Sequence, residues 1–259
     1  MLTSKVLVKK LKKLVSVSHQ EYSDSPPGAA RGHRDQGFGS ETFAQYGEDL
    51  IVANIFAILG IKAPTFLDIG AHHPFHINNT ALLYQRGSRG INVEANPILI
   101  KAFYKERPLD TNLNVGVATS RGSPIGTMTF YMIDDQSGRN TFDKETAEAF
   151  VRANPTFSIT KAVSLPMIDI NTIITRHAQG HWPNFLSIDI EGWDAAIIAD
   201  ADFGSSSPDV ICVEAISGDG NNVTRQLVEL LEARAYVAYA RTIANIIFVR
   251  AHVATRIWA

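Results

Sequence analysis

Two stretches of the sequence, FLDIGAHHP (Phe66–Pro74) and GINVEANP (Gly90–Pro97), decide the expected fold. Each contains a short apolar run that we interpret as a buried strand, and each carries an acid, Asp68 or Glu94. Ligands of an open parallel sheet bind beyond the carboxyl ends of its strands, so both acids are expected beside a binding site. An acid at the end of the second strand is placed to accept hydrogen bonds from the two hydroxyls of a ribose. The two stretches therefore predict a ribose-bearing ligand.

Short apolar runs alternate with amphipathic segments through the body of the chain. The expected strands are Thr65–Ile69, Gly90–Glu94, Leu113–Ala118, Phe185–Ile190 and Asp209–Glu214. The expected helices are Phe43–Leu59, with Thr42 as N-cap and Gly60 as its stop, then Asn79–Arg86, Pro97–Lys105, Trp193–Ala199 and Val223–Ala233. This alternation predicts an α/β fold with a mostly parallel sheet covered by helices on both faces. Tyr236–Ala240 and Asn245–Val249 predict a C-terminal antiparallel hairpin.

Residues 1–40 differ in composition from the rest of the chain. Lysines alternate with leucines in residues 1–17, which predicts either a basic amphipathic helix in weak contact with a membrane surface or a frayed terminus. Pro, Gly and charged residues in residues 23–40 are typical of a linker, so we expect the folded domain over residues 41–259. Residues 127–166 break the strand and helix rhythm with one strand-like run, Thr127–Ile133, and one helix-like run, Lys144–Ala153, and are expected to be an insertion that shapes the substrate side.

Composition excludes some classes of function. The 259 residues are 45% hydrophobic and carry a net charge of -2 at pH 7, which supports one large core and disfavours nucleic acid as a partner. The single cysteine, Cys212, lies in an apolar run and indicates a buried thiol in a reducing compartment. No apolar stretch has the length of a membrane span, and no signal peptide is recognisable, so we expect a cytoplasmic protein. The sequence indicates no oligomeric state.

Charge distinguishes the possible ribose-bearing cofactors. A dinucleotide carries a pyrophosphate, which requires a G-x-G-x-x-G turn, and this chain has only Gly70 there, preceded by the carboxylate of Asp68. S-adenosylmethionine presents an ammonium and a sulfonium and no phosphate, so an acid near the turn attracts it. The alternatives are a nicotinamide-dependent oxidoreductase, which the missing glycines disfavour, and a noncatalytic glycan- or protein-binding module on the same fold.

An ordered set of motifs resembles the FkbM-type methyltransferases. The set comprises Gln45, Gly47, Glu48 and Asp49, then DIGAHHP (Asp68–Pro74), Asn79 and Thr80, GINVEANP (Gly90–Pro97), Arg107 and Pro108, NTF (Asn140–Phe142), FLSIDIEGWD (Phe185–Asp194) and VICVEA (Val210–Ala215). The resemblance implies a Rossmann-like class I methyltransferase fold and O-methylation, often of sugars in glycans, lipids or natural products. The residues expected at the S-adenosylmethionine site are Asp68, Gly70, Ala71, His72, Asn79, Glu94, Ala95 and Asp189.

Catalysis of methyl transfer to a hydroxyl needs a base near the acceptor oxygen. Asp189 follows the fourth expected strand and is the first candidate for base or substrate orienter, although it could instead cap the following helix. His72 and His73 are the other candidates, because an imidazole accepts a proton near neutral pH. Many relatives have Asn, an acid and Gly where this chain has HHP, so the role of these histidines stays open. These side chains with Glu191 could in principle hold Mg²⁺, but no dense metal-ligand motif is present and no metal is predicted.

The acceptor is expected to be a small molecule or glycan. The segment DDQSGRNTF (Asp134–Phe142) combines small, polar and basic residues suited to sugar hydroxyls, although an exposed turn has the same composition. We predict acceptor contacts from Ser137 and Asn140 in this segment, together with His76 and Glu191. The sequence thus predicts an S-adenosylmethionine-dependent O-methyltransferase acting on a hydroxyl of a sugar, a glycan or a glycosylated or lipid metabolite.

Overall fold

The computed structural model describes residues 40–120, 125–135, 138–190, 192–215 and 222–258. Residues Glu41–Ala259 form one compact unit, to which the following description applies. The predicted membrane contact of residues 1–17 lies outside the described residues, as do two predicted site residues, Ser137 and Glu191.

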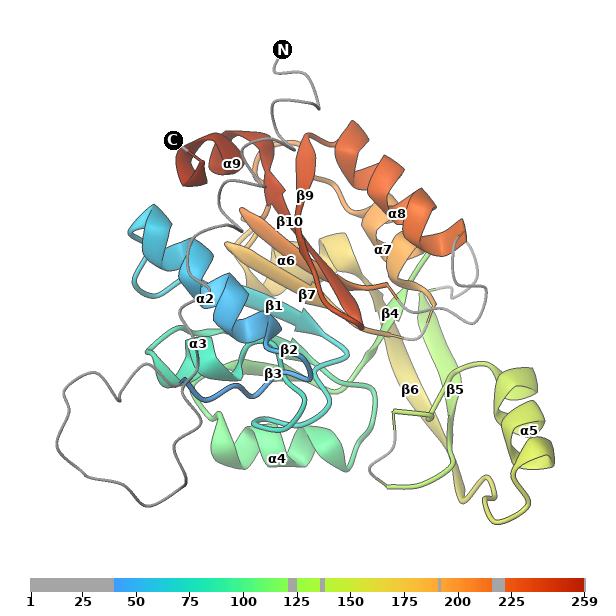
Figure 1. Ribbon diagram of the computed structural model, residues 1–259. Coiled ribbons are helices and arrows are strands. Elements are labelled where there is room, and N and C mark those ends of the chain that lie inside the picture. Colours follow the sequence, from blue (N-terminus) through green and yellow to red (C-terminus); the bar gives the residue numbers. More distant parts are fainter. Residues whose placement is uncertain (1–39, 121–124, 136–137, 191, 216–221, 259) are drawn as a thin grey trace, which may run out of the picture. The chain divides into compact units, whose positions relative to one another are not determined.

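Seven strands form the main sheet, in the order β3-β2-β1-β7-β8-β10-β9 (Figure 1). They are β1 (Phe66–Ile69), β2 (Gly90–Val93), β3 (Thr111–Leu113), β7 (Phe185–Ile188), β8 (Val210–Glu214), β9 (Tyr236–Arg241) and β10 (Asn245–Arg250). The five neighbouring strands β3, β2, β1, β7 and β8 pair in parallel, whereas β10 pairs antiparallel with both β8 and β9. The predicted mostly parallel α/β sheet with its C-terminal hairpin is confirmed. The chain runs outward from β1 to β3 and then returns to β7 on the other side of β1, which opens a crevice between the loops after β1 and β7.

Helices pack against both faces of this sheet (Figure 1), and each face contributes apolar side chains to a buried core cluster. One face is covered by α2 (Glu48–Leu59), α3 (Ala81–Gln85) and α9 (Ala251–Ile257). The other is covered by α6 (Ile170–His177), α7 (Asp194–Asp200) and α8 (Asn222–Ala233). A further helix, α4 (Leu99–Glu106), packs Ile100 and Phe103 against Ala71 in the loop after β1. Within the described residues, no helix has both the length and the apolar character needed to cross a bilayer.

The start of α2 differs from the prediction. Thr42 is not its N-cap, because Gly47 has a left-handed backbone (φ 82°) that keeps the preceding residues out of the helix. The Thr42 hydroxyl instead donates to Asp49 Oδ1 at 2.6 Å, and the Phe43 amide donates to Asp49 Oδ2 at 2.7 Å. Gly60 ends the helix in the left-handed conformation, as predicted.

A second sheet of three strands, in the order β4-β6-β5, includes much of residues 127–166, the segment predicted as an insertion. It contains β4 (Gly116–Ala118), β5 (Gly126–Met132) and β6 (Lys161–Asp169), and α5 (Lys144–Ala153) lies in the connection between β5 and β6. The single strand predicted over Leu113–Ala118 is wrong, because the chain leaves the main sheet at Asn114 and joins the second one at Gly116. β6 was not predicted, because Pro166 lacks the backbone amide that a strand residue donates to its neighbour. In the structure, β4 pairs with β6 only from Met167 onward, so Pro166 has no partner residue in β4.

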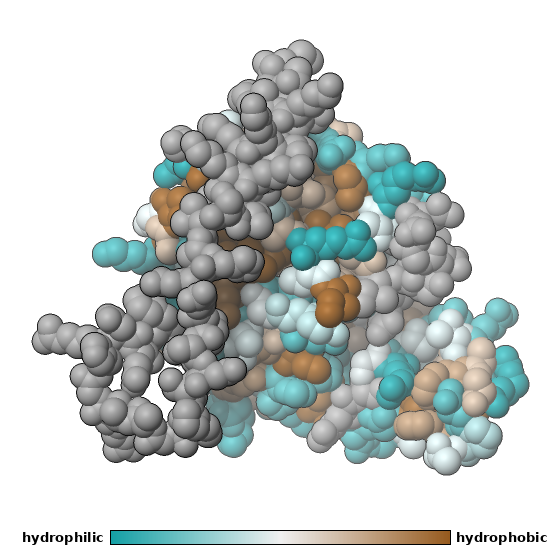
Figure 2. All heavy atoms as spheres, in the orientation of Figure 1, coloured by the Kyte–Doolittle hydropathy of each residue, from teal (hydrophilic) through white to brown (hydrophobic). Residues whose placement is uncertain are grey.

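Hydrophilic side chains gather over the outer surfaces of α8 and α5 in the view of Figure 2, while isolated apolar residues lie among polar ones elsewhere on that face. Both helices are amphipathic, so their polar sides are the ones that face solvent.

Candidate functional site

A pocket of about 400 Å³ lies at the carboxyl ends of the main-sheet strands, where the strand order reverses. Its walls come from the carboxyl ends of β1, β2, β7 and β8 and from the second sheet, and include Ile69, Gly70, Glu94, Val115, Phe130, Asn140, Phe142, Asp189 and Glu214. This volume is in the range of sites for small molecules and cofactors.

The turn after β1 brings two loops into direct contact at the pocket. Gly70 has a left-handed backbone (φ 78°), and a Cβ at this position would overlap the carbonyl oxygen of Asp189. The Gly70 amide donates to the Val93 carbonyl at 2.9 Å, and the Asp189 amide donates to the Ile69 carbonyl at 3.0 Å. Only glycine fits this turn, and the backbone at the floor of the pocket is fixed as a result.

Glu94 lies at the end of β2 with its carboxylate in the pocket wall. One oxygen accepts a hydrogen bond from the His72 amide (2.8 Å), and the other accepts one from the Asn96 amide (2.6 Å). The residue is only 8% exposed, and burial raises the pKa of its carboxyl to about 7 despite these two hydrogen bonds. Each carboxylate oxygen retains a further lone pair that can accept a hydrogen bond from a ligand.

Behind the pocket, a buried polar network fixes the loop between β1 and α3. The Asp68 carboxylate accepts hydrogen bonds from the Thr80 hydroxyl (2.9 Å) and from the Asn78 side-chain amide (3.0 Å). The fully buried Arg107 donates to the Thr80 hydroxyl oxygen (3.1 Å) and pairs with Asp110 (2.9 Å). Burial raises the pKa of Asp68, and the charge of Arg107 opposes this shift. Removing one member would leave buried charges without a partner, so the network holds the loop in one conformation.

The loop after β7 is held by the side chain of Asp194. The Asp194 carboxylate accepts hydrogen bonds from the amides of Ile190 and Gly192, both at 3.2 Å. Burial raises the pKa of Asp194. Asp194 is the first residue of α7, whose N-cap residue Trp193 makes no side-chain capping hydrogen bond, and Asp189 lies in the pocket wall.

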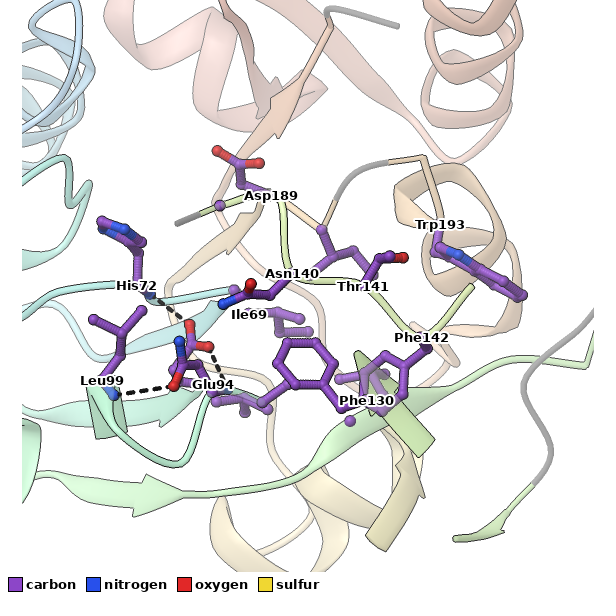
Figure 3. A pocket seen from close by; sticks show the side chains of 18 of the residues that line it. Ile69, His72, Glu94, Leu99, Phe130, Asn140, Thr141, Phe142, Asp189 and Trp193 are labelled. Carbon is purple, nitrogen blue, oxygen red and sulfur yellow. Dashed lines mark hydrogen bonds between the residues drawn. The ribbon is translucent and has the colours of Figure 1, made fainter. Parts of the chain in front are cut away.

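Aromatic side chains form the side of the pocket that faces the second sheet (Figure 3). Phe130 and Phe142 pack with their ring centroids 4.8 Å apart, and Trp193 lies beyond Phe142 in the same view. Asn140 lies between the aromatic side and Glu94, but its side chain accepts from the Ile133 amide (2.8 Å) and donates to the Asp134 carbonyl, which fixes its orientation.

The charges around the pocket have one sign. The described lining residues include three carboxylates, from Glu94, Asp189 and Glu214, and among them is no lysine or arginine. Arg139, although next to lining residues in the sequence, has its guanidinium over the rings of Phe150 and Phe157. The described wall therefore favours a cationic or neutral ligand over an anionic one.

Comparison with known proteins identifies the family. The profile of the methyltransferase FkbM domain matches residues 68–238, well over half of the 259-residue chain. The chain belongs to the FkbM methyltransferase family. Its resemblance to this family, predicted from the motifs, is confirmed.

Two solved structures are similar to the chain. One is a methyltransferase FkbM from Methylobacillus flagellatus KT, with 15% identity and a TM-score of 0.41 over 73% of this chain and 44% of that one. The other is a precorrin-6y C5,15-methyltransferase from Geobacter metallireducens GS-15, with 16% identity and a TM-score of 0.36 over 83% of this chain and 94% of that one. The chain thus spans less than half the length of the first structure. No curated protein matches it.

Within this FkbM domain, the structure brings most of the predicted site residues together. The predicted residues that line the pocket are Gly70, His72, Glu94, Ala95, Asn140 and Asp189. Asp68 on β1 and Ala71 in the loop after β1 are buried next to the pocket but do not line it. Asn79 also lies outside the lining and donates to the Ser187 hydroxyl at 3.2 Å.

Two of the three predicted histidines lie outside the pocket wall. His73 accepts a hydrogen bond from the Phe75 amide at 3.2 Å, and its ring lies edge-on to that of His76 at 6.3 Å between centroids. Burial lowers the pKa of His73, and the neighbouring imidazoles add to this shift. Neither residue lines the pocket, whereas His72 does, so His72 is the imidazole placed to act on a ligand.

Several residues that line the pocket were not predicted from the sequence. Gln45 and Ile77 line the pocket, and Met167 and Phe130 come from the second sheet. Gln45 belongs to a motif that the resemblance had already singled out, so that signal was present. Met167 had none, because β6 was not expected. Among the described residues, no group of three or more His, Cys, Asp or Glu side chains is arranged to hold a metal ion.

Proposed function

We propose that this FkbM domain is an S-adenosylmethionine-dependent methyltransferase that methylates a hydroxyl oxygen of a sugar or of a sugar-bearing metabolite. The observation that carries the proposal is the position of Glu94 at the end of β2, in a pocket whose described walls hold three carboxylates and no lysine or arginine. Such a wall suits a nucleoside that carries positive charge and lacks phosphate.

The residues present fit this cofactor. The Glu94 carboxylate, fixed by two backbone amides, would accept hydrogen bonds from the ribose hydroxyls. Leu99, Val115 and Val117 give an apolar surface in the same wall for the adenine ring. The tight turn at Gly70 lies against the Asp189 backbone, and this part of the floor would take the amino-acid end of the cofactor. When bound, the cofactor supplies an activated methyl group on a sulfonium.

Asp189 is the residue we assign to the acceptor hydroxyl. A sugar hydroxyl is a weak nucleophile until its proton is accepted by a base, and a carboxylate in the pocket wall can hold that proton and orient the oxygen. Asp189 lies in the pocket wall, directly after β7 and beside the Gly70 turn. His72, which also lines the pocket, is the second candidate (Figure 3).

The aromatic side of the pocket supports a sugar acceptor. The faces of sugar rings are rich in C–H groups and pack against aromatic rings, which Phe142 and Trp193 offer here. Thr141, beside the fixed Asn140, adds a hydroxyl to the same wall (Figure 3). These side chains would hold the ring while excluding water from the transferred methyl group.

Incubation with isotopically labelled S-adenosylmethionine and a panel of methyl glycosides, glycolipids and oligosaccharides tests the proposal. We expect one or more acceptors to gain a single labelled methyl group, seen by mass spectrometry. Asp189→Asn should lower kcat by roughly 10²- to 10⁴-fold, because the amide cannot take the proton. Asp202→Asn, a change at an exposed residue, is the control and should leave kcat unchanged.

Two results would contradict the proposal. If the protein binds the methyl donor but labels no hydroxyl in a broad panel, the sugar acceptor is wrong. If Asp189→Asn retains the full rate on a labelled acceptor, Asp189 is not the base.

A further inference from the structure

Backbone strain is concentrated at one edge of the pocket. In the described part of the chain, four residues other than glycine have positive φ, namely His72 (53°), Ile77 (50°), Gln179 (54°) and Ala235 (63°). Two of the four lie in the loop between β1 and α3. The left-handed region is especially unfavourable for a β-branched residue such as Ile77, and such strain persists only where the surroundings impose it.

Contacts on both sides of Ile77 impose its left-handed backbone conformation. The next residue, Asn78, is held through its backbone amide by the Phe43 carbonyl (2.9 Å) and through its side chain by Asp68 and Ala71. On the other flank, the ring of Phe75 packs against Phe43 at 5.9 Å between centroids. With both neighbours fixed, the backbone of Ile77 has little freedom to relax.

This conformation leaves a large apolar side chain at the pocket. Ile77 is 43% exposed and yet lines the pocket, in contrast to the buried aliphatic side chains of the core. The packing on both flanks imposes the backbone conformation of Ile77, but it does not explain why this strained position carries a large, partly exposed apolar side chain.

The loop that carries Ile77 lies between the two ends of the proposed cofactor. β1 is flanked by β2, which ends at Glu94, and by β7, which is followed by Asp189. A nucleoside whose ribose lies on Glu94 and whose side chain runs toward Asp189 passes the loop after β1. The loop therefore meets the amino-acid chain of the cofactor and not its base.

We infer that Ile77 is a cofactor-contact residue that covers the amino-acid chain of S-adenosylmethionine, held over it by the strained backbone of the loop. This inference rests on the proposed function. It implies that contact with Ile77 makes the protein bind nucleosides with the amino-acid group more tightly than nucleosides without it.

Calorimetric titration of wild type and Ile77→Gly with two ligands tests the inference. S-adenosylhomocysteine contains the amino-acid chain, and 5′-methylthioadenosine is a related nucleoside thioether without it. We expect Ile77→Gly to bind S-adenosylhomocysteine roughly tenfold more weakly, because apolar contact is lost, and 5′-methylthioadenosine with less than about a twofold change. Glycine tolerates positive φ, so thermal denaturation should show no loss of Tm.

Two further variants complete the design. Ile77→Asn keeps a side chain that tolerates the left-handed region but is polar, and should show the same selective loss. Gln179→Gly relieves a similar φ at an exposed residue outside the pocket wall and should alter neither affinity.

The outcomes separate this inference from the proposed function. Wild-type affinity of Ile77→Gly for S-adenosylhomocysteine would overturn the inference and leave the function standing. An equal loss for both ligands would also overturn it, because the change would then act through the whole loop. If the wild type binds neither ligand, the proposed function fails, and the inference fails with it.

Discussion

Replacing Glu94 by glutamine should change how the stability of the protein depends on pH. Burial raises the pKa of this carboxyl from its ordinary value of 4.5 to about 7 in the folded protein. The folded state therefore binds the proton more tightly than the unfolded state does. Stability linked to this group is fully present below pH 4.5 and is lost as the pH rises through 7.

The magnitude follows from the two pKa values. Between pH 5 and pH 8, ionisation of Glu94 should lower the free energy of unfolding of the wild type by roughly 2.5 kcal/mol. Glu94→Gln removes this pH dependence. Glutamine cannot accept both backbone hydrogen bonds through one oxygen, which costs about 1–3 kcal/mol, but that loss is the same at every pH. The difference between variant and wild type isolates the carboxyl.

Urea denaturation of both proteins at several pH values from 5 to 8, at constant ionic strength and without ligand, measures this difference. We expect the variant to gain roughly 2.5 kcal/mol relative to wild type across the range. Glu229→Gln, at an exposed position on α8, is the matched control. Curves for wild type and Glu94→Gln that stay parallel within about 0.5 kcal/mol would refute the reasoning, since Glu94 would then titrate as an exposed carboxyl does.

Two other substitutions test the framework of the pocket. Gly70→Ala should lower the free energy of unfolding, measured by urea denaturation, by more than about 2 kcal/mol, because the added methyl group overlaps the Asp189 carbonyl. Gly180 also has a positive φ (75°) but has open space around it, so Gly180→Ala should cost only about 1–2 kcal/mol. Equal losses would show that the close approach is unimportant. Arg107→Met leaves the buried Asp68 and Asp110 without their cation, and should cost about 3–5 kcal/mol by the same measurement. A loss below about 1 kcal/mol would mean that the network does not hold the loop.

The main sheet could be predicted because its strands are short, apolar and followed by turn residues. β1, β2, β7 and β8 each match an expected run closely, and the hairpin of β9 and β10 was apparent from two apolar runs around a polar turn. These signals are local, and the sequence contains them directly.

The second sheet could be predicted only in part. β5 corresponds to the strand-like run Thr127–Ile133, whereas the signals of β4 and β6 depend on tertiary contacts. β4 follows β3 after only two residues, so the two strands look like one apolar run. β6 contains Pro166 and exposes every second side chain over much of its length, and it becomes a strand only through pairing with β4 and β5. Phe130 lies on the predicted run of β5, but its place in the pocket wall depends on how the second sheet packs beside the main one.

The candidate site was predictable at the strand ends and less so in the loops. Glu94 and Asp189 follow their strands directly, and the rule for parallel sheets places both in the pocket. Asp68 is also at a strand end, but its side chain belongs to the network with Thr80 and Arg107, which only the packing of α3 and α4 reveals. Similarly, nothing in the sequence distinguishes His72 from His73.

Isothermal titration calorimetry with S-adenosylmethionine and with NAD⁺ tests the central claim most directly. The claim is that a pocket with acidic walls around Glu94 binds a cationic nucleoside without phosphate. We expect S-adenosylmethionine to bind with one site per chain and micromolar or tighter affinity, a substantial loss of affinity in Glu94→Ala, and no measurable binding of NAD⁺. Binding of NAD⁺ without binding of S-adenosylmethionine would contradict the account.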